Sequence, residues 1–232
     1  MRICHLITRL DRGGSSAAVL DLCGALAGEG HEVTLAAGRS EEPDEALRRL
    51  PAAVRLLVLD DLVRAPAPIP DLRTLAWLIG FFRRSRFDVI HTHTSKAGFL
   101  GRLAARLARI AYRMPDPRVV HQPHGHLFYG YYGWMGSAAV LLAERLAARW
   151  TDRFVALTER GVQEHVERGV GRRDMWTAIP PATRSCPADA PSPLRGEGGG
   201  EGRRIVFVGR LEHVKGPDLA LEAFAFIAKA EP

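Results

Sequence analysis

Hydrophobic and polar positions follow two periods along the first 180 residues. Short runs rich in Val, Ile and Leu predict buried β-strands at residues 2–7, 32–36, 54–59, 88–92, 118–122, 153–157 and 175–179. Between them, apolar residues recur every three or four positions and predict helices at residues 15–27, 72–84, 97–108, 137–148 and 159–168. Strands that alternate with helices are typical of parallel sheets. The sequence therefore predicts an α/β fold, a Rossmann-like parallel sheet flanked by helices.

The pattern changes after residue 180, where a Pro- and Gly-rich stretch can hold neither strand nor helix. We expect a first domain at residues 1–183, a linker at 184–202 and the start of a second domain at 203–232. The last part predicts one strand at 204–208 and one helix at 217–230. Because domains below roughly 40 residues rarely fold unaided, residues 203–232 are expected to be the truncated start of a second Rossmann-like domain.

Composition narrows the class of protein. With 47% hydrophobic and 25% charged residues, the chain has the proportions of a globular protein. The net charge of +6 suits an anionic partner such as a nucleotide or a phospholipid surface. Nucleic-acid binding is not expected, because no basic stripe with interleaved aromatic residues is visible.

The cysteines and the N-terminus both favour the cytoplasm. The three cysteines are odd in number and lack C-x-x-C spacing, so neither a disulfide framework nor a zinc ribbon is indicated. The apolar run at residues 3–7 is too short for a secretory signal and is followed at once by charged residues. We expect a cytoplasmic protein.

The apolar segment 75–86 ends in arginines and has two interpretations. It can be a core helix whose basic end suits the helix dipole, or a helix that lies on an anionic membrane. The core interpretation is favoured, and the membrane contact stays an alternative.

A glycine-rich turn follows the first predicted strand. Gly13 and Gly14 stand just before the helix that Ser15 opens, so backbone N–H groups and the helix dipole can favour an anion there. The alternative is a plain tight turn with a serine cap. Neither G-x-G-x-x-G nor G-x-x-x-x-G-K-[ST] is present, which excludes the standard dinucleotide and P-loop sites.

Two other strand ends are rich in histidine, and both are expected at the sheet edge where α/β proteins bind ligands. The first carries His93, Ser95 and Lys96, and the second carries His124, Gly125 and His126. His91 is expected to face the same side as His93, as a hydrogen-bond partner. A zinc site from His93, His124 and His126 is a minor alternative. Gly125 lets a ligand approach, so His124 is the strongest functional candidate.

Several segments together resemble the retaining nucleotide-sugar glycosyltransferases of the family-4 type, which have the two-domain GT-B fold. The resemblance rests on ITRLDRGGSS at 7–16, DVIHTHTSKAG at 88–98, HGHLFYGY at 124–131, TDRFVALTE at 151–159 and GRLEHVKG at 209–216. These segments occur in the family's order and span essentially the whole chain.

The resemblance implies sugar transfer from a nucleoside diphosphate sugar to a hydroxyl acceptor, with retained anomeric configuration and no required metal or other cofactor. Gly13 and Gly14 would lie near the donor phosphates, which Arg210 and Lys215 would hold. His124 would be catalytic, near the transferred sugar. The remaining substrate-cleft candidates are His93, Ser95, Lys96, Gly125, His126 and Glu159.

The partners implied are a nucleotide sugar and an acceptor that can be lipid-linked, which makes peripheral contact with the inner membrane face an option. Polysaccharide or glycolipid assembly would be the setting. The chain ends before the two glutamates with which the family's donor domain contacts the sugar and ribose. Enzyme activity of this chain alone is therefore left open, and the alternative is a non-catalytic acceptor-binding remnant that needs a partner chain.

Overall fold

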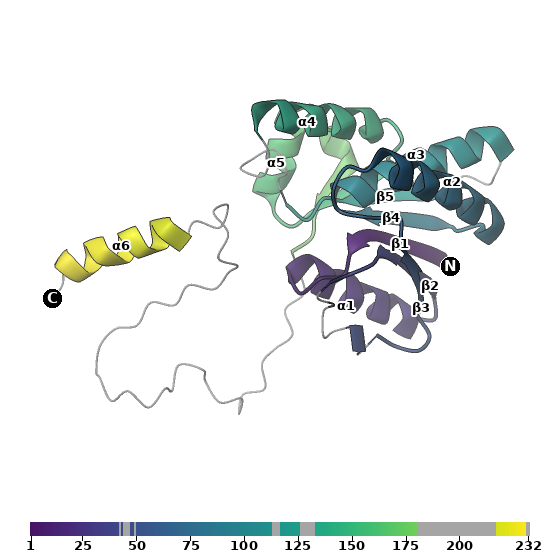
Figure 1. The fold of residues 1–232 in the computed structure, drawn as a ribbon, viewed down its shortest axis with the longest axis horizontal. Helices are drawn as coiled ribbons and strands as arrows, with labels where there is room; N and C mark the ends of the chain where they lie inside the picture. Colours follow the sequence, from purple (N-terminus) through teal and green to yellow (C-terminus); the bar gives the residue numbers. More distant parts are fainter. Residues whose placement is uncertain are drawn as a thin grey trace.

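The computed structural model describes residues 1–41, 43, 47–48, 50–112, 117–125, 133–180 and 217–230. The predicted strand at 204–208 and the predicted linker at 184–202 lie outside these residues. The first 180 residues form alternating strands and helices (Figure 1).

Seven parallel strands form one sheet, as the alternating pattern predicts. The strands are β1 (Arg2–Arg9), β2 (Glu32–Gly38), β3 (Arg55–Leu59), β4 (Val89–His93), β5 (Arg118–Gln122), β6 (Arg153–Ala156) and β7 (Trp176–Ala178). Their order in the sheet is β3-β2-β1-β4-β5-β6-β7. The order reverses direction between β1 and β4, and in open α/β sheets such a reversal opens a crevice at the carboxyl ends of the strands.

The helices match the predicted ones within a few residues. They are α1 (Gly14–Gly28), α2 (Pro68–Ser85), α3 (Ser95–Tyr112), α4 (Trp134–Ala148), α5 (Glu159–Glu167) and α6 (Pro217–Ala230), with a short 3₁₀ turn at Arg173–Met175. The α/β, Rossmann-like prediction is confirmed.

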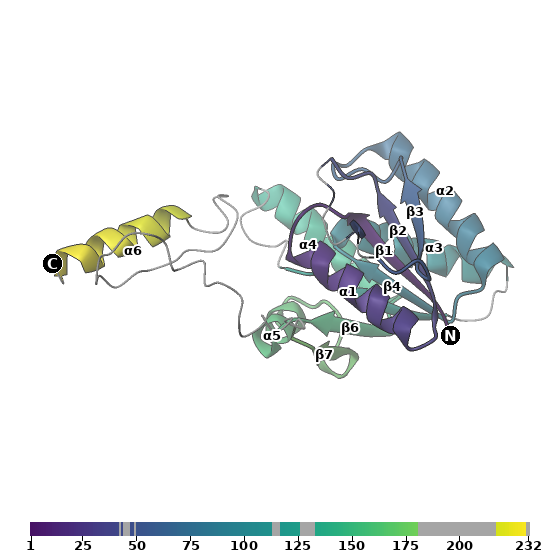
Figure 2. The ribbon, with the colours of Figure 1, turned by 90° about the horizontal axis from the view of Figure 1, so that it is seen from below.

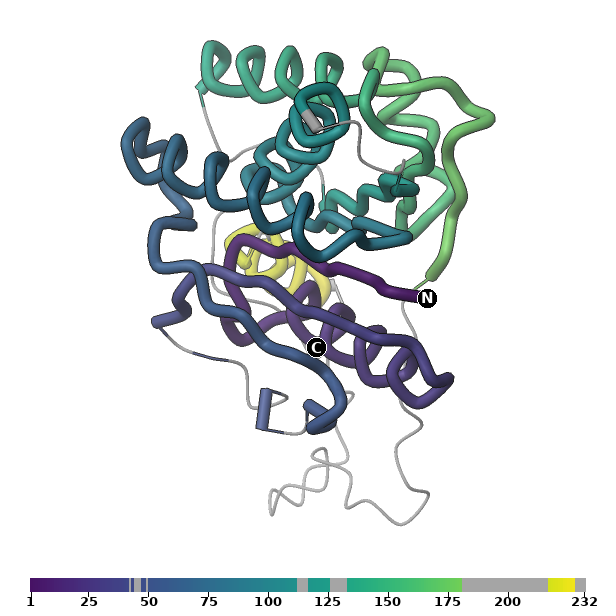
Figure 3. Tube along the Cα trace, turned by 90° about the vertical axis from the view of Figure 1, so that its right-hand side faces the viewer, coloured from purple at the N-terminus to yellow at the C-terminus, as the bar shows by residue number. Residues whose placement is uncertain are grey.

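The sheet carries one large hydrophobic cluster on each face, and a third cluster packs around β6, β7 and α5. Helix α1 lies on one face, and α2, α3 and α4 lie on the other (Figures 1 and 3). Figure 2 looks onto the side that carries α1. Ile7 and Leu35 pack with α1, whereas Leu6 and Ile90 pack with α2 and α3. Alternation along β1 therefore sends odd-numbered residues, including His5, toward the α1 side.

Helix α2 resolves the two interpretations of the segment 75–86. Leu78, Phe81 and Phe82 are buried in the core beneath α2 and α3. The basic residues Arg83 and Arg84 fall in its last turn, where positive charge stabilises the helix dipole. The structure therefore supports the core helix. No helix in the described ranges is both long and apolar enough to cross a membrane.

Candidate functional site

The carboxyl ends of β1, β4 and β5 lie side by side in the sheet and bring three turns together. The turn after β1 carries Gly13 and Gly14, the turn after β4 carries Thr94, and the turn after β5 carries His124. Gly13, Gly14 and His124 are positions that the sequence indicated, whereas Thr94 is not; all four lie at the edge of the sheet where the strand order reverses.

Two non-glycine residues at this edge have left-handed backbone conformations. Thr94 has φ of 60° and His124 has φ of 59°. Such values are uncommon, above all for a β-branched residue, and backbone strain of this kind gathers at functional sites. Thr94 is held by a 2.7 Å hydrogen bond between its Oγ1 and Oγ1 of Thr8, which ties the turn after β4 to β1.

Three glycines leave space open at the same edge. A Cβ built on Gly13, Gly14 or Gly125 meets no atom of the described residues within 4 Å. Gly13 is the N-cap of α1 and makes no side-chain cap bond, so Ser15 is not the cap. The N-cap residue therefore supplies no side chain to the first backbone amides of α1, and amides at a helix N-terminus can bind an anion.

A chain of hydrogen-bonded histidines runs from the sheet interior to this edge. His93 Nδ1 lies 2.9 Å from His124 Nε2, and His93 Nε2 lies 3.0 Å from His5 Nδ1. His5 and His93 are fully buried, and His124 is half-buried. His124, the predicted catalytic residue, is thus connected to two histidines behind it.

Burial keeps these imidazoles neutral near pH 7. Desolvation lowers the pKa of His5 and of His124 to about 4. It also lowers the pKa of His93 well below 6.5, with the neighbouring histidines adding to the effect. A neutral imidazole has one N–H and one lone pair, so each can serve as one donor and one acceptor.

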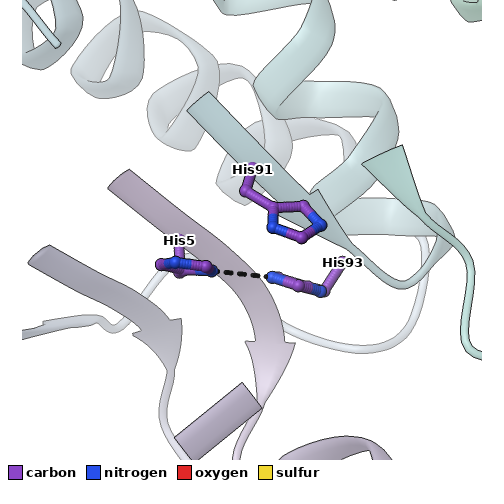
Figure 4. A group of neighbouring side chains, drawn as sticks. All are labelled: His5, His91 and His93. Atoms are coloured by element: carbon purple, nitrogen blue, oxygen red, sulfur yellow. Dashed lines mark hydrogen bonds between the residues drawn. The ribbon is translucent and has the colours of Figure 1, made fainter. Parts of the chain in front are cut away.

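His91 lies in the same cluster, as expected, but the hydrogen-bond partners of His93 are His5 and His124. Figure 4 shows the three rings, with His5 on β1 and the other two on β4. The rings of His91 and His93 have centroids 4.2 Å apart. One nitrogen from each of the three histidines lies within 4.8 Å of the others, a spacing that could hold a metal ion. The 3.0 Å contact between His5 and His93 is, however, a hydrogen bond as it stands.

A second polar cluster, which the sequence did not indicate, lies on the opposite face of the sheet. Arg102 on α3 is fully buried and pairs with Glu144 on α4 at 2.7 Å. His121 Nδ1 lies 2.9 Å from Thr92 Oγ1. His121 and Glu144 line a small pocket with Ser95 and Gly125. Arg102 and Glu144 stand at helical spacing among alanines and leucines, so only their charge within an apolar face could have marked them.

The remaining site candidates have different surroundings. Ser95 begins α3 and lines this small pocket. Lys96 forms an ion pair with Asp71 on α2, which gives it a structural partner. Glu159 is exposed at the start of α5 and pairs with Arg173 at 2.9 Å. His126, Arg210 and Lys215 lie outside the described residues.

The seven-stranded parallel sheet, with its open glycine turn and histidine at the carboxyl edge, defines a Rossmann-like domain of the GT-B kind. Residues 13–182 match the family described as glycosyl transferase 4-like domain, and the chain belongs to this family.

Two curated relatives extend the comparison. The UDP-Gal:alpha-D-GlcNAc-diphosphoundecaprenol alpha-1,3-galactosyltransferase of Escherichia coli is 34% identical over 105 residues, which cover 45% of this chain and 26% of that protein. The D-inositol 3-phosphate glycosyltransferase of Acidothermus cellulolyticus is 25% identical over 234 residues, covering 96% of this chain and 52% of that protein. The chain thus spans about a quarter and about half of the relatives it matches.

Solved structures share the fold at low identity. A sucrose-phosphate synthase from Thermosynechococcus elongatus has a TM-score of 0.57 and 17% identity, over 78% of this chain and 48% of that one. The lipopolysaccharide outer core galactosyltransferase WaaB has a TM-score of 0.55 and 11% identity, over 78% and 45%. A UDP-GlcNAc 2-epimerase from Methanocaldococcus jannaschii has a TM-score of 0.54 and 11% identity, over 77% and 45%. These similarities support the fold and leave the reaction open.

Proposed function

We propose that this chain is the acceptor-side domain of a glycosyltransferase that moves a sugar from a nucleoside diphosphate sugar to a hydroxyl acceptor with retained anomeric configuration. One observation carries the proposal: His124 and the open Gly13-Gly14 turn lie at the same edge of the sheet. The chain that holds them belongs to the glycosyl transferase 4-like family. A backbone amide site suits a phosphate, and a half-buried neutral imidazole suits a sugar.

The donor phosphates would also need the cations that follow residue 203. Arg210 and Lys215 are proposed to hold the diphosphate, whose negative charge grows as it leaves. Positioned cations stabilise such charge without a metal ion. We therefore expect sugar transfer to continue in EDTA, and no metal or other cofactor to be needed.

His124→Ala tests the role of His124 in the full-length protein as its cells make it. Removing one preorganised polar group from an active site typically lowers kcat by roughly 10²-fold or more. His31→Ala is the matched control, because His31 lies before β2, where its ring nitrogens lie next to the N-terminal amine and Glu29. Transfer of labelled sugar from a panel of nucleotide sugars is the measurement. Equal rates of sugar transfer in both variants would overturn the role of His124. A protein that binds the acceptor but no nucleotide sugar would instead be a non-catalytic binding remnant.

The acceptor is proposed to be lipid-linked, as in polysaccharide or glycolipid assembly at the cytoplasmic membrane face. The E. coli relative is named for a diphosphoundecaprenol-linked substrate. On α4, Met135, Leu142 and Leu146 recur along one face and are 68%, 67% and 40% exposed. Arg149, at the C-terminal end of α4, lines a surface pocket with Arg106 and Arg109 of α3. Exposed apolar side chains and basic residues both favour binding to an anionic bilayer.

Leu142→Glu tests this surface. The substitution places a negative charge on the exposed face of α4, so we expect binding to phosphatidylglycerol vesicles to fall at least several-fold in a sedimentation assay. Leu72→Glu is the control, because Leu72 on α2 is also 67% exposed and lies on the helix that the sequence offered as an alternative membrane contact. If only Leu72→Glu lost vesicle binding, the membrane contact would lie on α2 and not on α4. If neither variant lost vesicle binding, the membrane proposal would be contradicted.

A further inference from the structure

The histidine chain His5–His93–His124 has only a few ways to place its hydrogens. Each of the two contacts, at 3.0 and 2.9 Å, needs one N–H and one lone pair. If His93 gave both hydrogens it would be a cation, which full burial opposes. If it received both it would be an anion, which burial opposes as strongly. His93 therefore donates at one end and accepts at the other, and the whole chain points in one direction.

The buried end of the chain selects the direction. His5 Nε2 is buried and has no hydrogen-bond partner among the described residues. If hydrogens pointed inward, from His124 to His5, this nitrogen would carry an N–H with nothing to accept it. If they point outward, it carries only a lone pair. Buried N–H groups without a partner are rarer in proteins than acceptors that lack one, so the outward direction is favoured.

The outward direction determines what His124 offers a ligand. His5 Nδ1–H donates to His93 Nε2, and His93 Nδ1–H donates to His124 Nε2. The lone pair of His124 Nε2 is then occupied, and the single hydrogen of the neutral ring must sit on Nδ1. The backbone of His124 is left-handed, with φ of 59°, at the residue whose ring makes this contact.

We propose that His93, backed by His5, is a positioning residue that fixes His124 in the tautomer with hydrogen on Nδ1, so that His124 donates to a substrate oxygen and does not act as a base. This inference rests on the proposed function and specifies the ligand chemistry: a sugar hydroxyl or a phosphate oxygen that accepts one hydrogen bond. In this role the three histidines transfer no group and release no proton.

The test is two-bond ¹H–¹⁵N correlation spectroscopy on histidine-labelled full-length protein at pH 7.5, where a nitrogen with hydrogen and one without give distinct shifts. Wild-type His124 is expected to show hydrogen on Nδ1 alone. The spectrum is expected to stay the same after addition of equimolar Zn²⁺, because the contact of His5 with His93 is a hydrogen bond. Hydrogen on His124 Nε2, or zinc-shifted signals from His5 and His93, would overturn the proposal.

Two substitutions separate positioning from packing. His93→Phe fills the space but removes the donor, so the Nδ1 tautomer should give way to a mixture. His93→Asn keeps a side-chain NH₂ that can donate to His124 Nε2, so the tautomer should be retained in part. Equal tautomer populations in both variants and the wild type would contradict the role of His93. Because the readout involves no sugar transfer, its failure is distinguishable from failure of the proposed function.

In the active enzyme, the variants His93→Phe and His93→Asn should differ in kcat. We expect His93→Phe to lower kcat by roughly the factor seen for His124→Ala, and His93→Asn to restore much of it, with KM for the donor nearly unchanged. If His93 had a purely structural role, kcat and thermal stability would fall together in both variants.

Discussion

Buried histidines make the fold of this domain sensitive to pH. His5, His91, His93 and His121 are buried, and desolvation lowers the pKa of each below the ordinary value of 6.5. The domain therefore holds neutral imidazoles where an unfolded chain would hold cations in mild acid. This difference makes the stability of the fold depend on pH.

We expect the free energy of unfolding to fall as pH decreases from 6.5 toward 5. In this window the unfolded chain binds protons on histidines whose folded pKa is lower, as for His5 at about 4. Protonation thus favours the unfolded state, by up to roughly 1.4 kcal/mol per pH unit for each such histidine. Urea unfolding at pH 7.5, 6.5 and 5.5 measures the free energy of unfolding. A value that stays constant across this range would show that the folded protein does not bury these histidines in the neutral form.

At the scale of elements, the contact of α3 with the sheet depends on glycines. A Cβ on Gly98 would lie 2.4 Å from His121 Cε1, and one on Gly101 would lie 2.6 Å from Leu6 Cδ2. Helix α3 therefore approaches β1, β4 and β5 more closely than larger residues allow. This approach sets the position of the turn at Thr94, because Thr94 immediately precedes α3.

Gly98→Ala should destabilise the fold by about 1–3 kcal/mol, since overpacking a buried site forces shifts in its neighbours. His121 cannot move freely, because its ring is hydrogen-bonded to Thr92. Gly24→Ala in α1 is the control: its nearest neighbour is Pro51 at 3.6 Å, an ordinary contact, and we expect a gain of roughly 0.5–1 kcal/mol from helix propensity. The measurement is the thermal unfolding temperature of each variant. Similar shifts of this temperature in the same direction for both variants would contradict the close packing of α3.

At the scale of the whole molecule, periodicity predicted the strand and helix order because each element buries one face or both. It also placed Gly13, Gly14 and His124 at one sheet edge, because parallel strands end at the same edge. The histidine chain was not predictable in the same way. His5 looks like one more alternating strand residue, and its contact with His93 depends on the register of β1 beside β4, which aligns His5 with His91.

Two predicted cleft residues, Lys96 and Glu159, have ion-pair partners that the sequence did not indicate. Lys96 follows a strand end, as a ligand-binding residue would, but Asp71 on α2 lies close enough to pair with it. Glu159 pairs in the same way with Arg173, which follows it by 14 positions. Sequence spacing does not reveal such pairs, because they depend on how helices and turns pack after the chain folds.

The most direct test of the account is the product that the full-length protein makes from a nucleotide sugar. UDP-galactose and other labelled nucleotide sugars would be supplied with a polyprenyl diphosphate-linked N-acetylglucosamine acceptor, and the product analysed by NMR. We expect a new glycosidic bond with the donor's anomeric configuration, and the loss of this product in His124→Ala. A nucleotide sugar that is returned epimerised, or a glycoside of inverted configuration, would contradict it.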